Sequence, residues 1–555
     1  MYSLRNGLVT VGLVLASIGG LNAQDAPEDY LRAMQFEAVE SKKAEWIHWG
    51  DNEAVFSNWT YHSNRLIPVY SFGLKLDSVA GANSIYRNGE KLKQIYDRIP
   101  DQSVNSKADY FDQTDIYRLQ KNALAEGGTH KNLILIVFDG MDWQTTQAAS
   151  IYKHKQVLYT KGRGTGLSFL DFGVKNELSD YGYMVTSPHN NGTNPDVNGQ
   201  VVRDERSGKL GGYSAPLGGF HPWSKASSVT YLLGKLRSLP DVVTDSAASA
   251  TSMNSGIKTY NGSINVDPDG KPVISLARQL QSRGKAVGVV SSVPFSHATP
   301  ACAYANNVTR NDYQDISRDL LGLKSVAHRD NALPGMDVVI GCGWGEQKDD
   351  DRAKQGNNFV PGNKYLADED LEKVDVKNGG KYVVAQRTVD KKGSQVLEDA
   401  TQVAIEKQAR LFGFFGVKGG HLPYQTADGN YDPTRGQNAM DVYEPNDIAE
   451  NPTLAQMTDS ALKVLSQREE GFWLLVEAGD VDWANHNNNV DDSIGSVLSG
   501  EEAFDVAVKW VEENSTWDET AIILTADHGH MMVVDDLYAL TGIEKVEGSI
   551  EKDSK

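Results

Sequence analysis

Three continuous apolar runs that each lead into an acidic residue constrain the fold of this 555-residue chain most strongly. The runs span residues 132–138, 472–476 and 521–526, and the acids that follow them are Asp139, Glu477 and Asp527. Such runs are typical of strands buried on both faces of a parallel sheet. A fourth run, residues 286–290, has the same character. We therefore predict an α/β fold with a mostly parallel central sheet flanked by helices on both faces.

The acidic residues at the ends of these runs indicate where a functional site would lie. The carboxyl ends of parallel strands meet at one edge of a sheet, and ligands of open α/β folds bind at that edge. Three carboxylates gathered there are unfavourable to bury unless they bind something positive. The sequence thus predicts a cation site at the carboxyl edge of the sheet.

Charge and cysteine content narrow the class of protein. The formal net charge is −20, which disfavours binding to nucleic acid or to an anionic membrane surface. Two cysteines, Cys302 and Cys342, exclude both a disulfide framework and a cysteine-rich zinc site. Whether these two thiols pair is left open.

A serine lies in an unusual setting within residues 243–251. Small residues follow Ser246, so a helix that begins there can lie close to a ligand, and a helix N-terminus attracts phosphate. A serine at that point is placed for nucleophilic attack but needs activation. Asp245 and Ser246 alone would more often be an ordinary helix cap, whereas the whole run is far more specific.

This run, together with residues 256–262, resembles the nucleophile motif of the alkaline phosphatases. Other motifs of that family follow in the chain. They are residues 138–141, residues 297–301 with Arg310, the spaced set Glu477, Asp482 and His486, and residues 525–528. The resemblance covers about 139–310 and 471–530, and as a set these motifs are highly specific.

The resemblance implies a phosphomonoesterase with two zinc ions and one magnesium ion. Ser246 would attack phosphorus and become a phosphoserine, and Arg310 would bind two phosphate oxygens. Asp482 and His486 share one face of a helix and suit zinc. The second zinc site would use Asp139, Asp527 and His528, and the magnesium site would use Asp139, Thr299 and Glu477.

Two positions vary within the family. Some members carry Asp and Lys where this chain has His297 and Trp483. We expect His297 beside the magnesium site and Trp483 beside the phosphate pocket. The alternatives are zinc in the third site and ordinary core packing for Trp483.

The first zinc site lacks one expected ligand, because the family places a further histidine well after the Asp–His pair. Only 27 residues follow His528, and His530 is the one later histidine. His62 precedes a strand-like run at 66–72 and then Gly73, the pattern of the missing segment. We hypothesise that the final strand has moved to the N-terminus and that His62 completes the site. The alternatives are His530 or no replacement.

These motifs divide the chain into five segments. We assign residues 1–23 to a signal peptide, because Arg5 precedes an apolar stretch and small residues precede Gln24; an uncleaved anchor is the alternative. No other stretch approaches the length of a membrane span. The remaining segments are an N-terminal segment at 24–130, the catalytic core at 131–344 and 451–555, and an inserted cap subdomain at 345–450.

We therefore expect an exported enzyme, secreted or periplasmic, that hydrolyses small phosphate monoesters. No nucleic-acid binding and, after signal cleavage, no stable membrane association are expected. A homodimer stays open, because family members are often dimers. The alternatives are a phosphodiesterase or sulfatase of the same superfamily, and a non-catalytic phosphate or metal binder.

Overall fold

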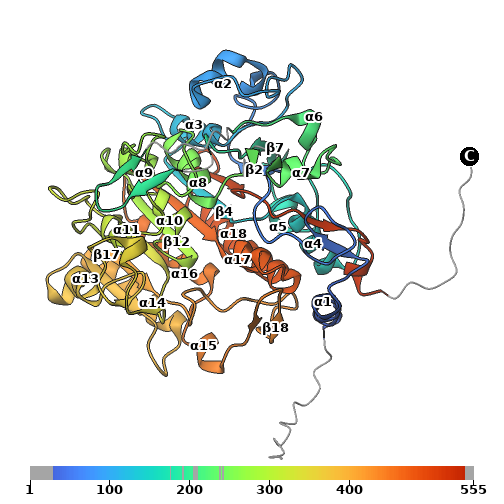
Figure 1. Ribbon diagram of the computed structural model, residues 1–555. Coiled ribbons are helices and arrows are strands. Elements are labelled where there is room, and N and C mark those ends of the chain that lie inside the picture. The colour runs from blue at the N-terminus through green and yellow to red at the C-terminus, as the bar shows by residue number, and fades with distance from the viewer. Residues whose placement is uncertain are drawn as a thin grey trace, which may run out of the picture.

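A ten-stranded sheet forms the centre of the computed structural model (Figure 1). The structure describes residues 29–175, 177–190, 193–203, 211–236, 239–240 and 243–543. In spatial order the strands are β16 (Tyr382–Gln386), β17 (Arg410–Phe414), β13 (Val338–Cys342), β12 (Ala286–Pro294), β20 (Phe472–Ala478), β4 (Asn132–Phe138), β21 (Thr520–Thr525), β2 (Ile67–Phe72), β7 (Asp180–Val185) and β3 (Phe111–Asp112). The strands from β16 to β21 are parallel to one another. The predicted α/β fold is confirmed.

The four apolar runs form the middle of this sheet. They become β12, β20, β4 and β21, which are neighbours in that order, and all their residues are buried. Their register places Glu477 opposite both Ser291 and Val137, and Thr525 opposite Val137. The ends of the three acid-bearing strands are therefore level, as the sequence predicts.

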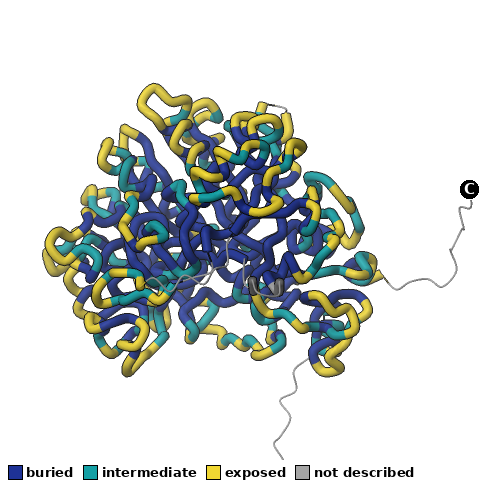
Figure 2. The backbone as a smooth tube through the Cα atoms, turned by 45° about the horizontal axis from the view of Figure 1, so that its top comes forward, coloured by how far each residue is buried: buried dark blue, intermediate teal, exposed yellow. Residues whose placement is uncertain are grey.

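Helices cover both faces of the sheet. Figure 1 shows α8 (Ser246–Ser255), α9 (Leu276–Gln281) and α10 (Ala298–Cys302) on one side and α16 (Leu454–Leu465) and α18 (Val490–Asn514) on the other. The sheet lies in the buried centre of the backbone in Figure 2. The contact of α18 with β4 requires a glycine, because a Cβ at Gly500 would lie 2.2 Å from Cε1 of Phe138.

Strand β2 runs opposite to both of its neighbours. It pairs with β21 through Val69 and Thr525 and with β7 through Val69 and Gly182. Because the pairing with β21 is antiparallel, the start of β2 lies beside the end of β21. The residues that precede β2, His62 among them, therefore reach the carboxyl edge of the parallel strands.

Residues 345–450, which we expected to form an inserted cap, are only partly separate from the core. Their strands β16 and β17 extend the central sheet next to β13. These strands are hydrogen-bonded into the sheet and largely buried, so this part is core. The loops and short helices around them remain available to cover the carboxyl edge.

Two further expectations concern the cysteines and the membrane. Cys302 and Cys342 are both buried free thiols, so the pairing left open by the sequence does not occur. Among the described residues, no helix combines the length and apolar character that a bilayer crossing needs. The predicted signal peptide at 1–23 lies outside the described residues.

Helix α1 (Tyr30–Ser41) anchors the N-terminal segment to the C-terminal half of the chain. The guanidinium of Arg32 lies 2.9 Å from Asp491, 3.0 Å from Asp428 and 3.2 Å from Asp432. Asp491 is fully buried, and burial raises the pKa of its carboxyl, an effect that Arg32 opposes. Arg32 is thus the counter-charge that makes the burial of Asp491 tolerable.

We expect Arg32→Met to lower the free energy of unfolding by about 3 kcal/mol, because it leaves a buried carboxylate unpaired. Adding Asp491→Asn should restore part of the loss. Urea unfolding followed by circular dichroism measures both effects. The control Arg435→Met removes an exposed ion pair with Glu40 and should cost less than about 1 kcal/mol. Equal losses for the two single variants would contradict this role.

Candidate active site

The carboxyl edge of the sheet brings four buried carboxylates together. Asp139 directly follows β4, Glu477 lies near the end of β20, and Asp527 comes two residues after β21. Asp482 is added by α17 (Asp480–His486), the short helix that begins two residues after β20. All four are at most 5% exposed. The cation site predicted from the strand ends thus has its acidic residues in one place.

Three ligand atoms form a triangle that suits a metal ion. Nε2 of His62 lies 3.1 Å from Nε2 of His486, and Oδ1 of Asp482 lies 3.5 Å from each of them. Ligands at zinc–ligand distances of 2.0–2.1 Å on a tetrahedron are about 3.3 Å apart. His62, Asp482 and His486 therefore fit one face of such a tetrahedron, which we call the first centre.

The two histidines of the first centre are oriented by backbone carbonyls. His62 Nδ1 lies 2.8 Å from the oxygen of Thr244, and His486 Nδ1 lies 2.7 Å from the oxygen of Thr60. When each Nδ1 donates to its carbonyl, each neutral ring turns an Nε2 lone pair toward the other. Two lone pairs 3.1 Å apart repel unless a cation lies between them, so this arrangement fits a metal.

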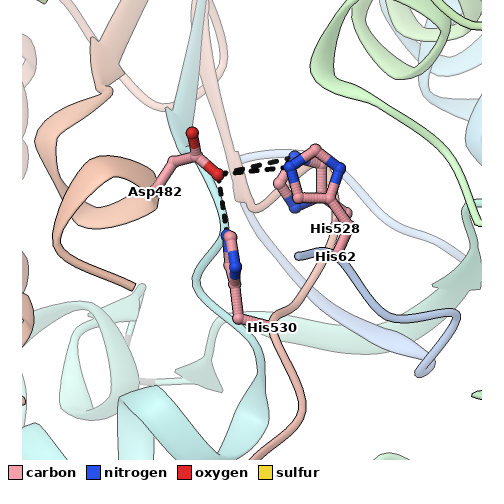
Figure 3. A group of neighbouring side chains, drawn as sticks. All are labelled: His62, Asp482, His528 and His530. Carbon is pink, nitrogen blue, oxygen red and sulfur yellow. Dashed lines mark hydrogen bonds and ion pairs between the residues drawn. The ribbon is translucent and has the colours of Figure 1, made fainter. Parts of the chain in front are cut away.

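His530 contacts the same aspartate at a different distance (Figure 3). Its Nε2 lies 2.7 Å from Oδ1 of Asp482, a hydrogen-bond length shorter than the edges of the first centre. We interpret His530 as a donor that orients Asp482 rather than as a ligand. Gly140 makes room for it, because a Cβ there would lie 2.7 Å from Nε2 of His530, and its φ of +74° also favours glycine.

A second centre lies beside the first. Nε2 of His528 is 3.3 Å from Oδ1 of Asp139 and 3.4 Å from Oδ2 of Asp527. Ser246 Oγ is 3.2 Å from the same nitrogen and 3.4 Å from the same Asp139 oxygen. The backbone N–H of Gly140 donates to Oδ1 of Asp527, whereas no described residue donates to Oδ2. These separations again fit the edges of a tetrahedral metal site, with the serine oxygen at one corner.

The proposed magnesium ligands lie on neighbouring elements. Oε2 of Glu477 accepts a hydrogen bond from Ser291, and Oε1 accepts none from any described residue. Thr299 lies on α10, is fully buried, and contributes a hydroxyl with no hydrogen-bond partner in the described part of the chain. Uncommitted buried oxygens are a suitable donor set for a hard cation.

Burial and crowding make the carboxylates reluctant to ionise without a cation. Burial, then the nearby Asp527, raises the pKa of Asp139 well above its ordinary value. Burial raises the pKa of Glu477 to about 8 and that of Asp527 to about 6. For Asp482, burial is outweighed by His486, His530 and His62, which hold its pKa well below the usual range. For all four carboxyl groups to be ionised at once, the cluster needs positive charge close by.

The N-terminus of α8 presents the serine. Ser246 is the first residue of the helix, and Asp245 caps it by accepting from the N–H of Ala248 at 2.9 Å. The second oxygen of Asp245 holds Arg310 at 3.0 Å. This contact opposes burial and keeps the pKa of Arg310 above its ordinary value. One aspartate therefore positions both the nucleophile candidate and the phosphate-binding candidate.

The two variable residues lie against this pocket. His297 Nδ1 is 3.4 Å from Arg310, and the ring of His297 meets the ring of Trp483 edge-on at 5.5 Å. Burial, then the charge of Arg310, lowers the pKa of His297 well below its ordinary value. His297 is therefore a neutral neighbour of Arg310.

Two contacts near the site were not predicted from the sequence. His421, which comes from the 345–450 segment, packs edge-on against Trp483 at 5.4 Å and is buried. The sequence analysis also did not predict the hydrogen bond from His530 to Asp482. A signal for it was present, because residues two apart, such as His528 and His530, point to the same side of an extended chain. No local signal could have placed His421 there.

Comparison with known proteins adds independent information. Residues 224–548 match the family model for alkaline phosphatase, more than half of the chain. The chain belongs to the alkaline phosphatase family. It is 28% identical over 315 residues to alkaline phosphatase 3 of Bacillus subtilis and 29% identical over 335 residues to an alkaline phosphatase of Escherichia coli. The family resemblance read from the motifs is confirmed.

These matches are partial. They cover 56% and 57% of this chain, and they span 55% of the Bacillus protein and 66% of the Escherichia protein. A cold-active alkaline phosphatase of Shewanella shares 21% identity with a TM-score of 0.42, covering 72% of this chain and 68% of its own. His62 and Asp139 lie outside the residues that match the alkaline phosphatase model.

The first centre predicts a graded effect of histidine removal on metal affinity. We expect His62→Ala to weaken zinc binding about a hundredfold or more, because it removes a ligand. His530→Ala should weaken it about tenfold, the effect usual for an outer hydrogen-bond partner. Competition with a chromophoric chelator measures both without relying on activity.

The matched control is His154→Ala, since His154 donates to the carbonyl of Gly166 outside the cluster. It should leave zinc affinity unchanged. Unchanged affinity in His62→Ala would show that His62 is not a ligand, and a larger loss in His530→Ala would make His530 the ligand instead.

Proposed function

We propose that this chain hydrolyses phosphate monoesters with Ser246 as the nucleophile. The observation that carries the proposal is the convergence of Ser246 Oγ, at 3.2 Å and 3.4 Å, on His528 and Asp139 at the start of a helix, with Arg310 held beside it by the same cap residue. Membership in the alkaline phosphatase family supports it. Because the curated relatives are matched over only part of their length, their activity enters here as a proposal.

We assign the metal ions to the three ligand sets already described. Zinc would be held by Asp482, His486 and His62 in the first centre and by Asp139, Asp527 and His528 in the second. Magnesium would be held by Asp139, Glu477 and Thr299, whose atoms are all oxygen. When bound, these ions would supply positive charge that stabilises the serine alkoxide and the leaving oxygen.

The reaction proceeds in two displacements. Ser246 Oγ attacks phosphorus as the bond to the ester oxygen breaks, and the leaving alkoxide takes a proton from water. The serine proton is lost to solvent. Water then attacks the phosphoserine and the Oγ–P bond breaks. The serine oxygen regains a proton from solvent, and phosphate leaves. The guanidinium of Arg310 binds two phosphoryl oxygens in both steps and opposes their charge.

The residues around the pocket favour monoesters over the alternatives. Arg310 can pair with the two charged oxygens that a monoester offers, whereas a diester offers one charge. A non-catalytic binder would have no use for a serine between metal ligands. The alternative functions are a phosphodiesterase, a sulfatase and a non-catalytic binder. Rates on a phosphodiester, on a sulfate and on a monoester distinguish these alternatives from a phosphomonoesterase.

Export is a further part of this proposal. It rests on the charge and apolar pattern of residues 1–23. Measurement of the molecular mass in solution would establish whether the chain forms a homodimer.

Hydrolysis of an aryl phosphate by purified protein tests the proposal. Activity should disappear on chelation and return when zinc and magnesium are restored, because the buried carboxylates would lose their cations. An aryl phosphodiester and an aryl sulfate should react at least about a thousandfold more slowly, since each carries one charge instead of two. Equal or faster reaction of the diester or the sulfate would reassign the enzyme.

Ser246→Ala should lower kcat by at least about a thousandfold, as expected for loss of a nucleophile. The control is Ser252→Ala on the same helix, where the hydroxyl donates to the carbonyl of Ala248, and it should retain activity. Mass spectrometry after acid quench should find phosphate on Ser246 in the native chain. Full activity of Ser246→Ala would refute the mechanism.

A further inference from the structure

A basic cavity of about 640 Å³ lies at the other edge of the sheet. Its walls include Asp337 just before β13 and Arg410 at the start of β17, and Lys285 immediately precedes β12. These are the amino ends of the parallel strands. From Ala286 to Ser291, level with Glu477, is five residues of strand, or about 17 Å. The cavity is therefore separate from the candidate active site.

The charge of this cavity runs against that of the whole chain. Five cationic side chains and one carboxylate, Asp337, line it, within a protein of net charge −20. The cations, which define what we call the basic groove, are Arg278, Arg283, Lys285, Arg410 and Arg468. Such a concentration of one sign is unfavourable by itself and attracts anions.

Most of these cations have no carboxylate partner. Arg278 donates to the amide oxygen of Asn306 at 2.6 Å, and Lys285 donates to the carbonyls of Lys131 and Glu470 at 2.7 Å each. Arg283 forms no ion pair with any described residue. Burial lowers the pKa of both Arg278 and Lys285, and Lys131 lowers that of Lys285 further. The charges of Asp319 and Glu470 oppose this lowering of the pKa at Arg278 and at Lys285, respectively. Neither carboxylate forms an ion pair with these cations in the described part of the chain, so their positive charges are only partly offset.

The one carboxylate is shared and already engaged. Oδ1 of Asp337 lies 3.8 Å from both Arg410 and Arg468, while Oδ2 accepts the N–H of Val287 at 2.9 Å. Nη1 of Arg410 also donates to the carbonyl of Pro334 at 2.5 Å. At 3.8 Å neither arginine makes a close ion pair, so both retain donors for an added anion.

The shape of the basic groove favours an elongated ligand. A second cavity of about 470 Å³ shares Asp337, Arg410 and Arg468 with the first, so the two lie next to each other. The volume is within the range of small-molecule sites. Tyr304 and Ile274 add apolar wall between the cations. A single phosphate would contact only a fraction of the five charges.

We propose that the basic groove binds a small anion built of two or more linked phosphate groups. Arg410 and Arg468 would hold one group, and Arg278, Arg283 and Lys285 would hold the next ones. This binding does not depend on the proposed hydrolysis, because no groove residue belongs to the candidate active site.

Titration calorimetry with inorganic tripolyphosphate tests the proposal. The protein is the metal-loaded chain carrying Ser246→Ala, and the titrant is the magnesium complex, with protein metal content measured before and after to exclude chelation. Saturating orthophosphate fills the pocket at Arg310. We expect one tripolyphosphate to bind per chain under these conditions, and to bind more weakly as NaCl is raised.

Arg283 and Arg468 of the basic groove are both exposed, so replacing them does not disturb the core. The test variant carries Arg283→Glu together with Arg468→Glu. It should weaken tripolyphosphate binding at least about tenfold. The control reverses two exposed arginines elsewhere, Arg352→Glu with Arg435→Glu, for the same change in net charge, and should bind like the parent. No binding, binding abolished by orthophosphate, or equal losses in both double variants would overturn the proposal.

Discussion

The burial of four carboxylates at one edge of a parallel sheet is the constraint on which the rest of this structure depends. Asp139, Glu477, Asp482 and Asp527 cannot all be charged in a dry interior without cations beside them. The surrounding elements meet that requirement in a definite way. His62 and His486 turn their Nε2 atoms toward each other while backbone carbonyls fix their Nδ1 atoms, and the N-terminus of α8 brings Ser246 to the same edge. The cost of this cluster in the absence of metal explains why metal binding and folding should be closely linked in this protein.

The direction of one strand decides whether the first centre is complete. Strand β2 comes early in the chain yet lies between β21 and β7, and because it is antiparallel to β21 its preceding residues reach the metal edge. Ser63 is hydrogen-bonded to Gly529 beside it, which fixes His62 against the loop that carries His528. A parallel strand at the same position would have carried His62 to the opposite edge. The order of segments in the chain is therefore less important than the register and direction with which they enter the sheet.

The two edges of the sheet have opposite electrostatic character. The carboxyl edge gathers acids that need metal ions, and the amino edge gathers arginines and a lysine that need anions. The same strands position both clusters. Strand β12 begins next to Lys285 of the basic groove, and its Ser291 lies level with Glu477 and donates a hydrogen bond to it. The central sheet thus positions two clusters that share no residue.

The amino-acid sequence by itself determined the buried strands, the acidic residues at their ends and the serine at a helix start, because each of these is a local pattern of burial, chain direction or capping. It also predicted Asp482 and His486 as a pair, since residues four apart share one face of a helix. The strand-like run after His62 favoured this histidine over His530 for the first centre. Only the pairing of β2 with β21 brings His62 beside His486 and Asp482. Tertiary structure alone revealed that β16 and β17 of the expected cap belong to the central sheet, that His421 packs on Trp483, and that five scattered cations form one groove. These features depend on residues far apart in the chain, and no local pattern encodes which distant backbone they will meet.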